Sequence, residues 1–198
     1  ALIGQFLLDR FPNELGTAEA AALAAQALQQ LVKSRRADNL PVEVEQRQMV
    51  HICNQVLEKW PERRETGDVA AMLIGTELDR KNLTGAAEVL ARLAADNPRR
   101  PWAELRLGIA SLQEADALVR VEEPSAEALQ QREVLRQQAL ELLLSAMQAP
   151  AAEITSFHFV GAANLAQLLN DQQRYAETVQ LLEDSPTAGL RRIEQNDP

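Results

Sequence analysis

The chain has 198 residues, of which 46% are hydrophobic and 25% are charged, a balance typical of folded soluble proteins rather than disordered ones. Its formal net charge of -9 opposes a sequence-independent grip on phosphates, so we expect no nucleic-acid partner. No apolar run reaches the roughly 18 to 20 residues that a membrane span requires, so we expect no membrane insertion.

Ala and Leu supply most of the apolar content, and aromatic residues make up only 4% of the chain. Both residues favour helices, whereas the β-branched and aromatic residues that suit strands are sparse. The composition therefore predicts an all-α protein. The single cysteine, Cys53, excludes an intrachain disulfide and leaves the compartment undetermined.

The first twelve residues predict part of a helical pair. Phe6, Leu7 and Phe11 continue a helical spacing that starts at Leu2, and Pro12 ends the run. We expect this helix to be the second member of a pair whose first member lies upstream. The chain would then be a fragment of a larger protein.

Residues 17–36 predict a long helix. Thr17 can cap its first turn, and the basic side chains of Arg35 and Arg36 suit the negative end of the helix dipole. One apolar stripe runs along this helix and consists of Leu23, Ala24, Ala27, Leu28 and Leu31.

A turn at residues 38–41 leads into a second helix that runs to about Trp60. Pro41 suits the first helical position, where its missing N–H has no partner to lose. Pro61 ends the helix. The residues that we expect to face inward are Val44, Met49, Ile52, Cys53, Val56 and Leu57.

Two seven-residue segments share one pattern: two aliphatic residues, an acid, a base, an aromatic residue, a proline and a polar residue. They are residues 7–13 and 56–62, and each is followed by a polar linker and a new helix. Internal similarity at a period of roughly 20 to 50 residues is typical of stacked helical arrays.

Residues 67–98 predict two antiparallel helices joined by a tight turn. Thr66 or Asp68 can cap the first helix, and Thr84 can cap the second. Pro98 closes the hairpin, because proline cannot continue a helix.

This hairpin resembles the tetratricopeptide repeat, a helical hairpin of about 34 residues. Counted back from the closing proline, Leu73 and Leu78 occupy the large apolar positions of the first helix. Ala86 occupies the small position where the two helices cross, and Leu90 the large position one turn later. Three positions depart from the family pattern: Ala70, Ile74 and Leu93.

Two further hairpins follow. Residues 101–150 predict a longer pair, in which residues 114–131 form an insertion that projects from the array and Ser125 caps the second helix. Ala139 and Leu143 take its small and large positions.

Residues 157–186 predict the last hairpin, with Tyr175 opening the second helix. Residues 187–196 form either one more short helix or a frayed tail. The positions of the last hairpin that match the repeat are Leu165, Ala166, Thr178 and Leu182.

The resemblance implies a single domain, residues 1–198, in which about four antiparallel hairpins stack into a right-handed α-solenoid. The units are residues 1–12 in part, 17–61, 67–98, 101–150 with its insertion, and 157–186.

Arrays of this family usually receive a peptide in a groove formed by the first helices of their hairpins. The carboxylate clamp of Lys and Asn that some members use is missing here, and acids and amides stand in its place. A neutral or weakly basic peptide would therefore fit better than an acidic one. The groove candidates are Asp68, Ala71, Gly75, Leu78, Asp79, Ile109, Leu112, Gln113, Asn164, Gln167 and Asn170.

The sequence offers few candidates for catalysis or metal binding. His51 and Cys53 stand two residues apart on a helix and so point about 200° apart, which favours a core cysteine and a partly exposed histidine over a shared metal. His158 is better explained as a packing or capping residue than as a ligand. The acid pair Glu122 and Glu123 lies in a predicted loop without a cleft that could separate the two pKa values.

No glycine-rich phosphate loop and no Gly-x-Ser-x-Gly elbow occurs in the chain. We therefore expect a protein that is not an enzyme and that needs no metal and no cofactor.

Four pairs of arginines fall at predicted helix ends or linkers. They either complement helix dipoles and meet solvent, or line up as a basic edge for an acidic partner. The pairs are Arg35 with Arg36, Arg63 with Arg64, Arg99 with Arg100, and Arg191 with Arg192.

The leading functional hypothesis is a protein-interaction scaffold that binds a peptide or partner protein through the solenoid surface. A structural spacer or self-association module without a peptide ligand is the first alternative. The second is a non-catalytic regulatory region of an enzyme.

Overall fold

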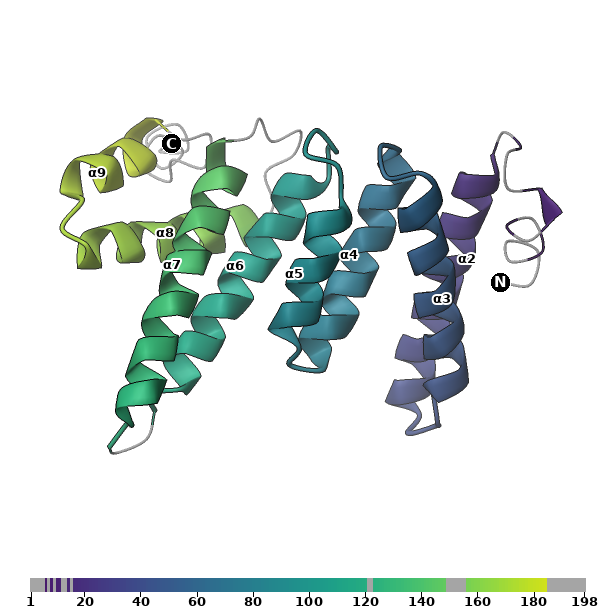
Figure 1. Cartoon of the computed structure of the whole chain (residues 1–198), viewed down its shortest axis with the longest axis horizontal. Helices are drawn as coiled ribbons and strands as arrows, with labels where there is room; N and C mark the ends of the chain where they lie inside the picture. Colours follow the sequence, from purple (N-terminus) through teal and green to yellow (C-terminus); the bar gives the residue numbers. More distant parts are fainter. Residues whose placement is uncertain are drawn as a thin grey trace, which may run out of the picture. The chain divides into compact units, whose positions relative to one another are not determined.

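The protein is all-α in the computed structural model, with eight bounded helices and no strand among the described residues (Figure 1). Contacts divide the chain into two compact units, residues 1–103 and 104–198, called unit 1 and unit 2 below. None of the described helices combines the length and the apolar character that crossing a membrane requires. The structure describes residues 16–120, 123–148 and 156–184, together with Phe6, Leu8, Arg10, Phe11 and Glu14.

Unit 1 holds two pairs of helices. α2 (Thr17–Ala37) packs against α3 (Glu43–Lys59), and α4 (Arg64–Asp79) packs against α5 (Leu83–Arg92). α4 also contacts both α2 and α3, so it joins the two pairs into one unit. In Figure 1, α2 lies behind α3.

α2 buries mostly alanines and leaves two of its three leucines exposed. Small side chains allow the backbones of neighbouring helices to approach closely, and α2 contacts both α3 and α4. The apolar stripe of this helix consequently divides: Ala24 and Leu28 are buried, whereas Leu23, Ala27 and Leu31 are exposed. The buried face consists of Thr17, Ala18, Ala21, Ala22, Ala24, Ala25, Leu28 and Val32.

The inward face of α3 follows the sequence prediction except at its start. The helix begins two residues after Pro41, and Val44 is 56% exposed, so the prediction that Val44 faces inward is wrong. Val44 lies in the first turn, ahead of the part of α3 that carries the buried residues. Those residues are Met49, Ile52, Cys53, Val56 and Leu57.

Most of the predicted helix caps are wrong. Gly16, with φ of 89° in the left-handed region that favours glycine, precedes α2, and Thr17 makes no capping bond. Arg63 precedes α4 without a side-chain cap. Asn82 caps α5 in place of Thr84, since its side-chain oxygen accepts a hydrogen bond of 3.0 Å from the Gly85 N–H.

The prediction for α7 (Ala126–Gln148) is confirmed: the hydroxyl oxygen of Ser125 accepts a hydrogen bond of 3.1 Å from the Ala128 N–H. This is the bond expected of an N-cap serine, and it satisfies one of the amide groups that the first helical turn leaves without a helical partner.

Thr17 and Thr66 do not cap their helices but bind the preceding chain. Each follows one of the two segments that share the repeated pattern, and each binds the aromatic residue of its segment. The Thr17 hydroxyl donates a hydrogen bond of 2.8 Å to the carbonyl oxygen of Phe11, and the Thr66 hydroxyl donates to that of Trp60. Both threonines are buried, and each tethers the start of its helix to the aromatic residue six positions earlier.

The segments that lead from Phe11 into α2 and from Trp60 into α4 are called the first and second junctions. Both contain the same backbone turn, which recurs at a third junction between Ala94 and α6 (Arg100–Ala117). The Arg63 N–H donates to the Trp60 carbonyl and the Thr66 N–H to the Arg63 carbonyl. The third junction starts at Ala94, 34 residues after Trp60, and its two hydrogen bonds also join residues three positions apart. The matching pairs are Glu14 to Phe11 and Thr17 to Glu14 at the first junction, and Asn97 to Ala94 and Arg100 to Asn97 at the third.

At the third junction, the side chains of Asn97 and Arg100 bind backbone carbonyls. Asn97 is buried, and its side-chain Nδ2 donates to the Arg63 carbonyl at 2.9 Å, which ties the third junction to the second. The Arg100 guanidinium donates to the Leu93 carbonyl at 2.5 Å, at the end of α5. The Leu93 carbonyl therefore keeps a hydrogen-bond partner after α5 ends.

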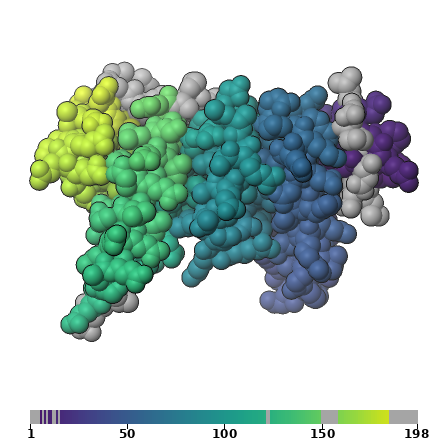
Figure 2. Space-filling model, viewed as in Figure 1, coloured from purple at the N-terminus to yellow at the C-terminus, as the bar shows by residue number. Residues whose placement is uncertain are grey.

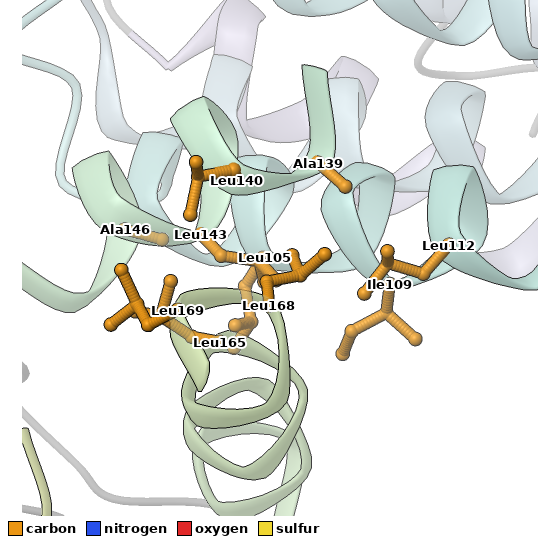
Figure 3. Packing of buried hydrophobic residues seen from close by; sticks show 10 residues of the cluster. All are labelled: Leu105, Ile109, Leu112, Ala139, Leu140, Leu143, Ala146, Leu165, Leu168 and Leu169. Carbon is orange, nitrogen blue, oxygen red and sulfur yellow. The ribbon is translucent and has the colours of Figure 1, made fainter. Parts of the chain in front are cut away.

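Unit 2 is built around one apolar cluster (Figure 3). α6 (Arg100–Ala117) begins at the boundary of the two units and supplies side chains to the cluster together with α7 and α8 (Ser156–Asp171). α9 (Tyr175–Asp184) follows and contributes the partly buried Leu181. The cluster consists of Leu105, Ile109, Leu112, Ala139, Leu140, Leu143, Ala146, Leu165, Leu168 and Leu169.

Small residues set the distance between α6 and α7. A Cβ atom added at Gly108 would lie 3.0 Å from Cγ of Leu143 and 3.4 Å from the carbonyl oxygen of Ala139, so the backbones cross closely here. Ala139 is fully buried at this crossing. Leu182, which the sequence places at a large apolar position, is exposed instead, and its neighbour Leu181 packs against the cluster.

The far end of the α6–α7 pair contributes nothing to the core. Among the described residues between 116 and 134, none is buried. Figure 2 shows this end of α7, in green, standing clear of α8 and α9. It belongs to the segment predicted as an insertion, residues 114–131. Most of residues 1–12, Glu122, Arg191 with Arg192 and residues 187–196 lie outside the described residues.

Candidate functional site

An open hollow of about 450 Å³ lies between α2 and α4 in unit 1 and is called the α2–α4 hollow below. Both helices are the first members of their pairs, so the hollow occupies the kind of position that the sequence analysis proposed for a groove. Its lining residues are Leu23, Gln26, Ala27, Gln29, Gln30, Asp68 and Met72.

Helical spacing places these side chains together. On α2, Gln26 and Gln30 are four residues apart, as are Leu23 and Ala27, so each pair lies on neighbouring turns of one face. Asp68 and Met72 have the same spacing on α4. The hollow therefore combines apolar surface with amide groups, which both donate and accept hydrogen bonds.

Leu23 lines the hollow with an exposed fraction of 58%. Leu31, two turns further along α2, is 44% exposed. Full burial of a leucine side chain stabilises a fold by about 1.5 to 3 kcal/mol relative to full exposure, and α2 forgoes part of this gain at Leu23 and Leu31. The exposed leucines of α2 thus remain available for another molecule to cover.

Asp68 is the sole charged side chain among the described residues that line the hollow. Its Oδ1 lies 2.8 Å from Nε of Arg99, and the Asp68 side chain is 33% exposed. The backbone of Arg99 is held in place because its N–H donates to Oδ1 of the buried Asn97 at 3.0 Å. Gly67 permits this arrangement, since a Cβ there would lie 2.4 Å from Asn97 Oδ1.

The other α4 candidates from the sequence lie apart from the lining. Ala71, Gly75 and Leu78 are partly exposed on α4, and Asp79 is exposed. Oδ2 of Asp79 lies 3.3 Å from the guanidinium of Arg36 at the end of α2. Of the five α4 candidates, the structure places only Asp68 in the hollow.

Two α6 candidates are corrected by the structure. Ile109 and Leu112 are 8% and 7% exposed and belong to the core of unit 2, so neither offers a surface for a peptide (Figure 3). The reason is that α6 packs against α7 and α8 at once, which buries side chains that would face a groove. Gln113, the next residue, is exposed.

The three candidates on α8 are polar surface residues of unit 2. The Asn164 side chain donates a hydrogen bond of 2.8 Å to the Val160 carbonyl of its own helix. Gln167 and Asn170 are exposed. None of the three lines a described hollow together with the candidates on α4.

Sequence reasoning missed the α2 half of the hollow and Met72. The resemblance to the repeat assigns positions to residues 67–98 and to none of residues 17–36. A signal was nevertheless present: glutamines at positions 26, 29 and 30 interrupt the alanine-rich helix beside Leu23. Amides at helical spacing next to an exposed leucine indicate a mixed apolar and hydrogen-bonding face.

A second, smaller hollow of about 310 Å³ lies on unit 2, and its charges already pair with one another. Arg132 lies 3.3 Å from Glu133, and Arg136 forms an ion pair with Asp171. With two cations matched by two anions, the hollow has no net charge to attract an ion. Its lining residues are Arg132, Glu133, Arg136, Gln137, Asp171 and Gln172.

Cys53 and His51, the candidates for a nucleophile or a metal ligand, do not form a site together. Burial raises the pKa of the Cys53 thiol to about 12, so the thiolate does not form near neutral pH. His51 is exposed on the same helix, with Nε2 at 3.2 Å from the Gln55 amide. No cluster of three or more His, Cys, Asp or Glu side chains in the described part of the chain is arranged to hold a metal.

The arginine pairs have several structural uses. Arg35 and Arg36 lie in the last turn of α2, where they complement the dipole, and Arg35 also binds Glu45 at 2.9 Å. Arg63 and Arg64 stand instead where α4 begins, and Arg99 and Arg100 where α6 begins. The dipole explanation therefore fails for Arg63 and Arg64, whereas the Arg100 guanidinium donates to the Leu90 and Leu93 carbonyls at the negative end of α5.

Comparison of the chain with protein-family models, with curated proteins and with solved structures finds no match.

Proposed function

We propose that this protein is a protein-interaction scaffold that binds a peptide segment of a partner protein in the α2–α4 hollow. The observation that carries the proposal is the reversal of burial on α2, where alanines are buried and Leu23 is exposed beside a hollow. A hollow of about 450 Å³ falls within the usual range for ligand sites, about 300 to 1,000 Å³.

The helical pairs support a tetratricopeptide-like array as the framework of this scaffold. The backbone turn at Trp60 recurs 34 residues later at Ala94, which is the length of one such repeat. Ala86 and Ala139 are fully buried at the small crossing positions of their pairs. We infer that about four helical pairs stack on one another in a right-handed solenoid and that the first helices of the pairs share one face.

The chemistry of the hollow favours an extended or helical peptide over a small metabolite. Gln26 and Gln30 offer donors and acceptors for a peptide backbone, and the exposed Leu23 and Ala27 offer apolar surface for its side chains. The hollow is open to solvent rather than enclosed, which suits a segment of a larger molecule. Binding would bury the exposed part of Leu23, which favours association by the hydrophobic effect.

A display library of random dodecapeptides, selected on the whole chain, tests this proposal. Peptides that bind wild type should lose affinity at least tenfold for Ala27→Arg, which places a long charged side chain across the hollow. Leu129→Arg is the matched control, because Leu129 is an exposed apolar residue on α7 of unit 2. The proposal fails if selected peptides bind both variants and wild type alike, or if no peptide is enriched.

Circular dichroism keeps the test interpretable. Ala27 is exposed and makes no side-chain bond, so Ala27→Arg should keep the helical spectrum and the melting temperature of wild type. A variant that melts early would be replaced by Leu23→Gln, which removes the exposed apolar surface without changing charge.

A further inference from the structure

The charge distribution of the α2–α4 hollow specifies its ligand more closely. Five of its lining residues come from α2 and are all neutral, and Asp68 from α4 supplies its charge. Unit 1 as a whole is nearly neutral, since residues 1–103 contain 13 Lys and Arg and 14 Asp and Glu. The charge that lines the hollow is therefore one local carboxylate, and this carboxylate already pairs with Arg99.

The Asp68 carboxylate is held beside Arg99 and is still accessible. Oδ1 lies 2.8 Å from Nε of Arg99, and a third of the Asp68 side chain remains exposed. Arg99 is itself 45% exposed, so this ion pair is a weak surface pair that another cation can replace. The backbone of Arg99 stays fixed by its bond to Asn97 when the guanidinium moves.

Resting on the proposed function, we propose that the bound peptide carries a Lys or Arg side chain that binds Asp68, and that Arg99 competes with it. Arg99 then acts as an internal occupant of the site, which an incoming cation displaces. The apolar residues next to that cation cover Leu23 and Ala27, and the α2 glutamines bind the peptide backbone.

Competition has a signature that a purely structural ion pair lacks. Asp68→Asn removes the ligand's partner and should weaken binding about tenfold, the lower range for a hydrogen bond to a charged group. Arg99→Gln removes the competitor and should tighten binding about two- to fivefold, the range of an exposed ion pair. A pair that merely supported the fold would give a loss in both variants.

The variants are chosen to preserve packing. Gln retains the Cβ and Cγ atoms with which Arg99 lies against Gly67, so Arg99→Gln changes only the end of the side chain. Asp79→Asn is the matched control for Asp68→Asn, since Asp79 is an exposed acid on the same helix that pairs with Arg36 outside the hollow.

The experiment uses the library-selected dodecapeptides and titration calorimetry with the full chain. The inference predicts enrichment of a Lys or Arg flanked by apolar residues, loss of affinity when that residue becomes Gln in the synthetic peptide, and opposite effects of Asp68→Asn and Arg99→Gln. Asp79→Asn should leave affinity unchanged.

Failure of this inference is distinguishable from failure of the proposed function. Selected peptides without a basic residue, or with affinity that Asp68→Asn leaves intact, would overturn the inference while Ala27→Arg still abolished binding. Equal losses for Asp68→Asn and Arg99→Gln would also overturn the competition. Peptides insensitive to Ala27→Arg would overturn the proposed function itself.

Discussion

Replacing Thr66 by Val tests whether the repeated junction contributes to stability. Thr66 is fully buried, and its hydroxyl donates to the Trp60 carbonyl, which ties the end of α3 to the start of α4. Val has nearly the same shape and lacks only the hydroxyl. The substitution therefore removes one hydrogen bond without opening a cavity.

The expected cost follows from what remains at the junction. The Trp60 carbonyl still accepts the Arg63 N–H at 3.1 Å, and the Thr66 N–H still donates to the Arg63 carbonyl at 3.1 Å. No buried polar group is left without a partner, so the loss is that of one net hydrogen bond, about 1 kcal/mol. Thr17→Val should cost the same, because Thr17 makes the equivalent bond to Phe11.

The measurement is urea unfolding followed by circular dichroism, with the slope of the transition compared between variants. The double variant of Thr17 and Thr66 should lose about 2 kcal/mol, since the two sites share no hydrogen-bond partner. Thr84→Val, at an exposed position, should change stability by less than about 0.5 kcal/mol. A wild-type midpoint for Thr66→Val would show that the shared bond has no energetic role.

Three further predictions concern packing and the buried thiol. Gly67→Ala should lower the free energy of unfolding by about 1 to 3 kcal/mol in urea titration, because its Cβ would meet Asn97 Oδ1 at 2.4 Å; wild-type stability would contradict the close approach. Leu143→Ala should cost about 2 to 5 kcal/mol by thermal unfolding, since Leu143 is fully buried in the core of unit 2; a loss below 1 kcal/mol would be inconsistent with that burial. Because burial raises the pKa of Cys53 from 9.0 to about 12, the unfolded thiol ionises first, so stability should fall as pH rises above about 9. At pH 8 a thiol reagent should label Cys53 only after denaturant is added, and rapid labelling of the native protein would refute its burial.

Helix positions were predictable because periodicity and breakers act locally. Residues 17–36 and Tyr175 as the first residue of the last helix agree with the observed bounds of α2 and α9 within one residue. Proline and the helical spacing of apolar residues depend only on neighbours a turn away, so tertiary contacts do not disturb them.

Helix caps were harder to predict because several polar residues compete near each start. At the α4 start, Thr66 turns its hydroxyl toward Trp60, a contact that depends on where α3 ends. At the α5 start, Asn82 precedes Thr84 and reaches the Gly85 N–H first. The outcome therefore depends on the path of the preceding chain, which a local pattern does not contain.

The candidate site was predictable only in part. The repeat register led to Asp68, because one aligned hairpin was enough to place residues along α4. It failed for Ile109 and Leu112, since their burial depends on α7 and α8 packing around α6. It also missed the glutamines of α2, whose exposure follows from which face of that helix meets α3 and α4.

The amino-acid sequence by itself determined the all-α class, the order of the helices, and the repeated motif at residues 7–13 and 56–62. These properties follow from residue propensities and short-range spacing. Only the tertiary structure decided that α2 buries alanine and exposes Leu23, and that Asp68 meets Arg99 beside the α2–α4 hollow. Which face of a helix is buried is settled by the volume that its neighbours leave, and that volume is a property of the packed unit.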